Sequence, residues 1–151
     1  MMIFKYSKRN NNLTGFTLIE LMVVIVILGI LATIITPKIL DRPEQARRMK
    51  AKVEIREFQS ALALYKSDTG SFPTTSQGLE ALVNDPGVKG WKKGGYLEGN
   101  KVPNDPWGNP YIYLCPGLHG TDYDLESYGK DGEDGGTDNN ADIENWNLDS
   151  E

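Results

Sequence analysis

The sequence predicts an α+β chain in which one long helix precedes a few short strands. Three observations carry this expectation: an apolar run from Phe16 to Ile35, a helical stripe of apolar residues that begins at Ala51, and two β-rich runs after residue 110. The chain has 151 residues, so once the N-terminal run is set aside it can form one small domain and no more.

The apolar run is long enough to cross a membrane. It holds 20 residues, and at about 1.5 Å per residue a helix of that length spans about 30 Å, the thickness of the hydrocarbon core. We therefore expect a membrane-spanning segment over residues 16–36. The preceding leader contains Lys5, Lys8 and Arg9 and no acidic residue, which predicts a cytoplasmic N-terminus and an extracytoplasmic head over residues 37–151.

Glu20 is unusual for a simple membrane anchor. A lone carboxylate inside an apolar run costs several kcal/mol unless a partner compensates it. A cut between Gly15 and Phe16 would free an amine that could serve as that partner in a neighbouring copy. An ordinary secretory signal is cut after its apolar region, whereas a cut at Gly15 keeps that region in the mature chain.

The helix is expected to continue past the membrane segment to about residue 69. Pro37 lacks a backbone donor and Gly29 lowers helix propensity, so residues 29–37 should be its weakest part. Beyond them, apolar residues recur at spacings of three and four, which places them on one helical face. These residues are Ala51, Ile55, Phe58, Leu62 and Tyr65. Gly70 is expected to end the helix.

Basic residues are concentrated in the same part of the predicted helix. They are Lys38, Arg42, Arg47, Arg48, Lys50, Lys52 and Arg56. Such a run is consistent with a solvated helix face and, beside lipid headgroups, with a contact between subunits.

The second half of the chain is expected to be less regular. Thr75 or Ser76 is a candidate N-cap for a short helix to about Asn84, and the many Gly and Pro residues over 85–110 indicate an irregular connection. Strands are expected at 111–114 and 123–128, with a third near 96–99 or at 143–148.

The distribution of charge and the lone cysteine and histidine limit the classes of function that the chain can have. Residues 122–151 hold eleven acidic residues and one lysine, which argues against a nucleic-acid partner and suits a cation. Cys115 and His119 are single occurrences, and we interpret them as a small buried hydrophobe and a turn residue. The sequence contains no recognisable nucleophile and base pair, phosphate loop or HExxH motif, so we do not expect an enzyme.

The stretch Gly15-Phe16-Thr17-Leu18-Ile19-Glu20, followed by the apolar run, resembles the prepilin peptidase site of type IV pilins and type II secretion pseudopilins. Further stretches are similar to the major pseudopilins of type II secretion, also called the general secretion pathway protein G family. They are residues 65–75 and 77–82, Asp105-Pro106-Trp107-Gly108-Asn109-Pro110-Tyr111 and Ser127-Tyr128-Gly129-Lys130-Asp131-Gly132. The resemblance thus extends over nearly the whole chain.

The resemblance implies a type IV pilin-like fold, in which the long N-terminal helix packs on a small antiparallel sheet. It also implies that prepilin peptidase removes the leader, residues 1–15, and that the new N-terminal Phe16 is methylated. Glu20 would contact the N-terminus of an adjacent subunit, and we expect the segment that ends at Pro37 to lose helical hydrogen bonds on assembly.

The family binds calcium in its acidic C-terminal loop. The resemblance places side-chain ligands at Asp131, Asp138 and Asn140, with carbonyl groups of Tyr128 and Glu133 completing the shell. Composition alone is equally consistent with a flexible acidic loop, so the calcium expectation depends on the resemblance.

The implied function is that of the major structural subunit of a periplasmic pseudopilus, a homopolymer that drives export of folded proteins across the outer membrane. Expected partners are minor pseudopilins, the inner-membrane assembly platform and prepilin peptidase. The chain would cross the inner membrane once, with its head in the periplasm. One alternative is a membrane-tethered calcium-binding module. Another is a type IV pilin, but such pilins commonly close their C-terminal region with a disulfide, which a single cysteine excludes.

Overall fold

The computed structural model describes residues 15–149, apart from the side chains of residues 33–41. Contacts divide the chain into two compact units, with the division between Leu40 and Asp41. Helix α1 is assigned from Leu18 to Thr69 and contributes residues to both units. Three short 3-10 helices come later in the chain, η1 at Leu79–Leu82, η2 at Glu98–Asn100 and η3 at Asp138–Asn140.

The part of α1 that belongs to the second unit supplies one wall of the hydrophobic core. The predicted stripe is confirmed, since Ala51, Ile55, Phe58, Leu62 and Tyr65 are each at most 1% exposed. Their three- and four-residue spacing places them on one face, and that face can therefore be buried completely. The helix ends as predicted: Gly70 comes directly after it with φ +90° and donates to the carbonyl of Lys66 at 2.8 Å.

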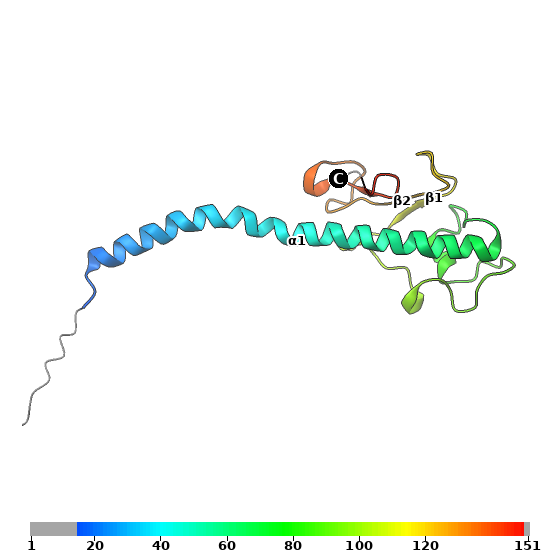
Figure 1. Ribbon diagram of the computed structural model, residues 1–151, viewed down its shortest axis with the longest axis horizontal. Helices are drawn as coiled ribbons and strands as arrows, with labels where there is room; N and C mark the ends of the chain where they lie inside the picture. Colours follow the sequence, from blue (N-terminus) through cyan, green and yellow to red (C-terminus); the bar gives the residue numbers. More distant parts are fainter. Residues whose placement is uncertain (1–14, 150–151) are drawn as a thin grey trace, which may run out of the picture. The chain divides into compact units, whose positions relative to one another are not determined.

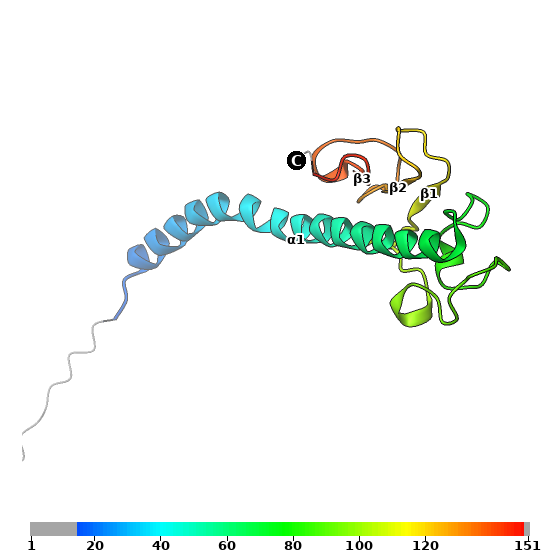
Figure 2. The same ribbon diagram turned by 45° about the vertical axis from the view of Figure 1, so that its right-hand side comes forward.

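A three-stranded antiparallel sheet covers this face. Its strands are β1 at Ile112–Leu114, β2 at Asp124–Ser127 and β3 at Ile143–Glu144, in the order β1-β2-β3. Figures 1 and 2 show the sheet on one side of the C-terminal part of α1 and η2 on the opposite side. The expected α+β arrangement of a long helix on a small antiparallel sheet is confirmed, and the third strand is the later of the two alternatives.

The connection between helix and sheet differs from the prediction at one element. The expected helix from Thr75 or Ser76 to Asn84 is replaced by the four-residue η1, and no side chain caps it. The hydroxyl of Thr75 bonds across to Cys115 instead, where it donates to the carbonyl at 3.0 Å and accepts from the amide at 2.9 Å. The short helix therefore begins later than expected, at Leu79 with Gly78 in the N-cap position, and the Thr75 hydroxyl makes a tertiary contact instead of a cap.

Three aromatic residues attach the irregular segment to the core. Trp91, Tyr96 and Trp107 all pack against the buried cluster. The indole of Trp91 donates to the carbonyl of Ala81 at 2.8 Å, and that of Trp107 donates to the carboxylate of Glu44 at 2.6 Å. The segment is thus fixed by side chains where regular hydrogen bonding is missing.

The apolar side chains near the start of α1 are exposed, with Leu18 at 79% and Ile19 at 72%. Within the part of the chain that the structure describes, no helix combines the length and the apolar character that crossing a membrane requires. The span predicted for residues 16–36 includes side chains that lie outside the described part.

Candidate functional site

The predicted processing residues lie just before α1. Gly15 and Phe16 precede the helix and are exposed, Phe16 to 83%. The first turn is closed by Thr17, whose hydroxyl accepts a hydrogen bond from the amide of Glu20 at 3.3 Å. The Gly15–Phe16 peptide bond therefore lies before the helix, between two exposed residues.

The second predicted assembly residue, Pro37, has a side chain that lies outside the described part of the chain. Helix α1 is assigned without interruption over residues 29–37. The expected loss of helical hydrogen bonds in this segment concerns the assembled filament and stays a prediction.

The acidic loop begins at a well-anchored position after β2. The hydroxyl of Ser127 donates to the buried carboxylate of Asp105 at 2.6 Å and accepts from the amide of Gly129 at 3.1 Å. The side-chain amide of Asn109 donates to the carbonyl of Gly129 at 3.2 Å. The Asp-Pro-Trp-Gly-Asn turn thus fixes the place where the loop leaves the sheet.

The predicted calcium ligands are distributed along this loop. Asp131 and Glu133 are exposed, and the carboxylate of Asp131 accepts from the amide of Glu133 at 3.3 Å. Asp138, with φ +54°, and Asn140 are the first and last residues of η3, and Tyr128 comes directly after β2 and is half-buried.

The structure brings a different set of carboxylates together. One oxygen each of Glu126, Asp134 and Asp142 lies within 4.8 Å of the other two. The Oδ1 of Asp142 is buried without a hydrogen-bond partner, while its Oδ2 accepts from the amide of Gly135 at 2.7 Å. We refer to Glu126, Asp134 and Asp142 as the carboxylate cluster.

The electrostatics of the carboxylate cluster reflect crowding of negative charge. Burial, followed by the charges of Asp142 and Asp134, raises the pKa of Glu126 to about 7. Burial also raises the pKa of Asp142, against the lowering effect of the hydrogen bond from Gly135. Like charges and desolvation both disfavour ionised carboxylates, and a bound cation would relieve both.

The residues of this region fit a hard cation. Calcium takes six to eight oxygen ligands from carboxylates, amides and carbonyls, and Asp142 Oδ1 is a buried oxygen that accepts no hydrogen bond within the described part of the chain. The loop backbone is tightly wound, because a Cβ at Gly129 would lie 3.1 Å from the carbonyl oxygen of Ala141. A Cβ at Gly136 would lie closer still to the carbonyl oxygen of Asn140, and both residues have positive φ, so both positions favour glycine.

Sequence reasoning did not single out Glu126 or Asp142. Glu126 alternates with the buried residues Leu125 and Ser127, and it reaches Asp142 because β2 pairs with β3 in the register Glu126↔Glu144. The sequence left two positions for the third strand, near 96–99 or at 143–148, so the register of β2 with β3 could not be predicted. Without that register, the approach of Glu126 to Asp142 could not be predicted either.

His119 has a more specific environment than a plain turn residue. Its Nδ1 lies 2.9 Å from the carboxylate of the buried Asp124, and its ring stacks on Trp146 with 4.0 Å between centroids. The contact joins the loop after β1 to the C-terminal segment. Cys115, expected to be buried, is half-buried: it packs against the core, and its thiol donates to the carbonyl of Asp122 at 3.6 Å.

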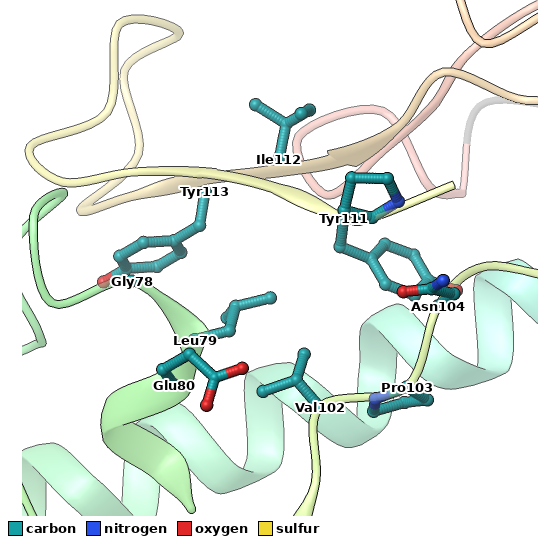
Figure 3. A pocket seen from close by; sticks show the side chains of 10 residues that line it. Gly78, Leu79, Glu80, Val102, Pro103, Asn104, Tyr111, Ile112 and Tyr113 are labelled. Atoms are coloured by element: carbon teal, nitrogen blue, oxygen red, sulfur yellow. The ribbon is translucent and has the colours of Figure 1, made fainter. Parts of the chain in front are cut away.

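An open groove of about 370 Å³ lies between η1, residues 102–104 and β1. Figure 3 shows Tyr113, Leu79 and Val102 around it, with Glu80 and Asn104 at its edges. Glu80 is the one charged residue among those that line it, and its carboxylate accepts from the side-chain amide of Asn84 at 3.0 Å. The groove lining therefore offers apolar contact and carries no nucleophile with an adjacent base.

Two family models match the chain, one after the other. A model described as the prokaryotic N-terminal methylation motif matches residues 10–36. A model described as type II secretion system protein G matches residues 38–146. The first match contains Gly15, Phe16 and Glu20, and the second contains the whole acidic loop.

Curated relatives and a solved structure agree with these matches. The chain is 54% identical over 137 residues to the type II secretion system core protein G of Pseudomonas aeruginosa, covering 88% of this chain and 94% of the relative. It is 47% identical over 144 residues to the protein of the same name from Vibrio cholerae, covering 93% and 97%. A crystal structure of the major pseudopilin from the type 2 secretion system of enterohaemorrhagic Escherichia coli is similar, with TM-score 0.62 and 34% identity over 76% of this chain and 98% of that one.

Proposed function

Because the chain belongs to the type II secretion system protein G family, we propose that it is the major structural subunit of a pseudopilus. The family is one of structural pseudopilins and not of enzymes. The observation that carries the proposal is the succession of the two family matches over residues 10–36 and 38–146, which together span almost the whole chain.

We propose that the subunits polymerise through their N-terminal helices and that the filament drives export of folded proteins across the outer membrane. Prepilin peptidase would cleave between Gly15 and Phe16, and the chain would cross the inner membrane over residues 16–36 with its head in the periplasm. Exposure of the apolar side chains at the start of α1 supports this proposal, because an apolar helix face needs lipid or other subunits to cover it.

Minor pseudopilins and the inner-membrane assembly platform would be the partners of the filament. The test of this function is complementation of a bacterium that lacks its own major pseudopilin. The chain should restore secretion of the folded cargo, and a Glu20→Ala variant expressed at the same level should not. Accumulation of cargo in the periplasm of cells that express the unaltered chain would contradict the proposal.

We also propose that the acidic loop binds calcium. The ligand set expected from the resemblance is Asp131, Asp138, Asn140 and the carbonyls of Tyr128 and Glu133. The carboxylate cluster of Glu126, Asp134 and Asp142 is a second candidate set, which the orphaned Oδ1 of Asp142 favours. When bound, calcium would supply positive charge and tie the loop into one conformation.

The calcium proposal is tested by thermal melting of the full chain in detergent, with calcium and with chelator. Binding to the folded state alone stabilises it by about 2.7 kcal/mol at a free calcium concentration of 100 times Kd, so the midpoint should rise with calcium. Asp131→Ala should abolish the rise if the first set binds, and Asp142→Asn if the second does.

Glu98→Ala is the matched control, because Glu98 is an exposed acidic residue outside the loop. It should keep the full calcium response. Identical midpoints of the unaltered chain with calcium and with chelator would contradict a calcium site in either set.

A further inference from the structure

Arg48 of α1 connects the helix to the end of the acidic loop. Its Nη1 donates a hydrogen bond to the carbonyl oxygen of Ala141, 93 residues further along the chain. The side chain is half-buried. This contact is unlike those of the neighbouring basic residues, since Arg47 pairs with Glu44 and Lys50 with Glu54 one turn away on the same helix.

The carbonyl that Arg48 binds lies where three parts of the loop meet. Ala141 stands between Asn140, a member of the first candidate ligand set, and Asp142, a member of the second. The backbone passes close to these carbonyls: a Cβ at Gly129 would meet the Ala141 carbonyl, and a Cβ at Gly136 would meet that of Asn140. A bond that fixes residue 141 therefore restrains both candidate sets.

The charged residues around Arg48 are consistent with a role in positioning residues 140–142 of the acidic loop. Arg48 and Lys52 line a small hollow together with Asp142, Ile143, Glu144 and Asn147. The hydrogen bond from Nη1 of Arg48 to Ala141 ends on a carbonyl oxygen, so this bond takes up no carboxylate oxygen of Asp142. Outer groups that hold metal ligands in place typically contribute a factor of about 10 to 100 in metal affinity.

We propose that Arg48 is a positioning residue for the cation loop, holding residues 140–142 in the arrangement that binds calcium and thereby coupling the loop to helix α1. The inference rests on the calcium proposal above. Coupling between two contacts is reciprocal, so bound calcium should strengthen the contact of Arg48 with Ala141 and with it the turn of α1 around residue 48.

The first test is calcium affinity, measured by titration calorimetry with calcium chloride on the full chain in detergent at fixed pH. Arg48→Gln should weaken calcium binding about tenfold. Arg48→Lys keeps the charge and one donor, so it should lose less. Arg47→Gln is the matched control, since it removes the adjacent guanidinium without touching the loop, and its affinity should equal that of the unaltered chain.

The second test is hydrogen exchange of the same proteins with calcium and with chelator. If Arg48 had only a structural role, calcium would not change the exchange rates around it. Calcium should slow exchange over residues 45–52 in the unaltered chain and in Arg47→Gln, and should not in Arg48→Gln. If Arg48→Gln does not fold, Arg48→Lys takes its place. Calcium should then slow exchange over residues 45–52 less in Arg48→Lys than in Arg47→Gln.

Equal calcium affinities of the Arg48 variants and the unaltered chain would overturn the inference and leave the calcium site standing. So would equal losses in the Arg47 and Arg48 variants. Absence of calcium binding by the unaltered chain would overturn both proposals.

Discussion

The buried carboxylate of Asp124 accepts hydrogen bonds from several groups of the loop that precedes it. Its partners are the amide of Leu118 at 2.6 Å, the hydroxyl of Thr121 at 3.0 Å and Nδ1 of His119 at 2.9 Å. Burial alone would raise the pKa of Asp124, but these hydrogen bonds outweigh burial and lower the pKa below its usual value.

A lowered pKa makes this stabilisation dependent on pH. It is fully present above the pKa of an unfolded aspartate, about 4, and is lost as the pH falls through the lower pKa of the folded state. Asp124→Asn should therefore reduce the free energy of unfolding by about 2 kcal/mol at pH 7, and the difference from the unaltered chain should shrink below about pH 4. Urea unfolding at several pH values measures both effects.

Asp122→Asn is the control for this experiment, because Asp122 is exposed and pairs with Lys66 at the surface. It should change the unfolding free energy by less than about 1 kcal/mol at any pH. A constant difference between Asp124→Asn and the unaltered chain from pH 7 to acid would contradict the assignment of a stabilising charge to Asp124.

Gly15 and Phe16 permit a test of processing at single-residue level. The mature chain should begin at Phe16, with a methylated amine, and Gly15→Leu should keep the leader because the bulkier side chain does not fit a site selective for glycine. Intact-mass measurement on membrane preparations distinguishes the two forms. A mature chain that still carries residues 1–15 would contradict cleavage at this bond.

Among the secondary-structure elements, local pattern predicted helix α1 better than the segment after it. The stripe from Ala51 to Tyr65 and the stop at Gly70 depend on spacing and on one backbone preference, and both are readable in the sequence. The short helix expected from Thr75 or Ser76 to about Asn84 is confined to Leu79–Leu82, and the Thr75 hydroxyl bonds to Cys115, 40 residues away. A contact of that range leaves no local signal.

In the acidic loop, too, local sequence was informative and contacts between distant residues were not predictable. The expectation of a cation loop came from the family resemblance, whereas the convergence of Glu126, Asp134 and Asp142 depends on the β2–β3 register. Arg48 likewise belongs, by sequence, to a basic helix face, and only the folded chain distinguishes it from Arg47. Residue types were predictable here, and partnerships across the fold were not.

Helix α1 also carries a prediction about assembly. Residues 29–37 are assigned as helix in the single chain, yet Pro37 lacks a backbone donor and Gly29 lowers helix propensity. We expect this segment to lose helical hydrogen bonds in the filament. A filament map with continuous helix from residue 29 to 37 would contradict this, and Pro37→Ala filaments should show more helix there than unaltered ones.

At the scale of the whole molecule, the chain consists of two compact units that are built differently. The first residues of α1 expose apolar side chains, which favours burial in lipid or against other copies. The unit from Asp41 onward has its own core of helix, sheet and aromatic residues. A chain organised in this way can assemble through one part while its head remains folded.

Polymerisation through the N-terminal helix is best tested by electron microscopy of filaments sheared from cells that overproduce the chain. The unaltered chain should give thin helical fibres made of the mature protein. Glu20→Ala should give a folded, membrane-bound protein with few or no fibres, because alanine lacks the carboxylate that would contact the neighbouring N-terminus. Absence of fibres from the unaltered chain, or a normal yield from Glu20→Ala, would contradict assembly by this contact.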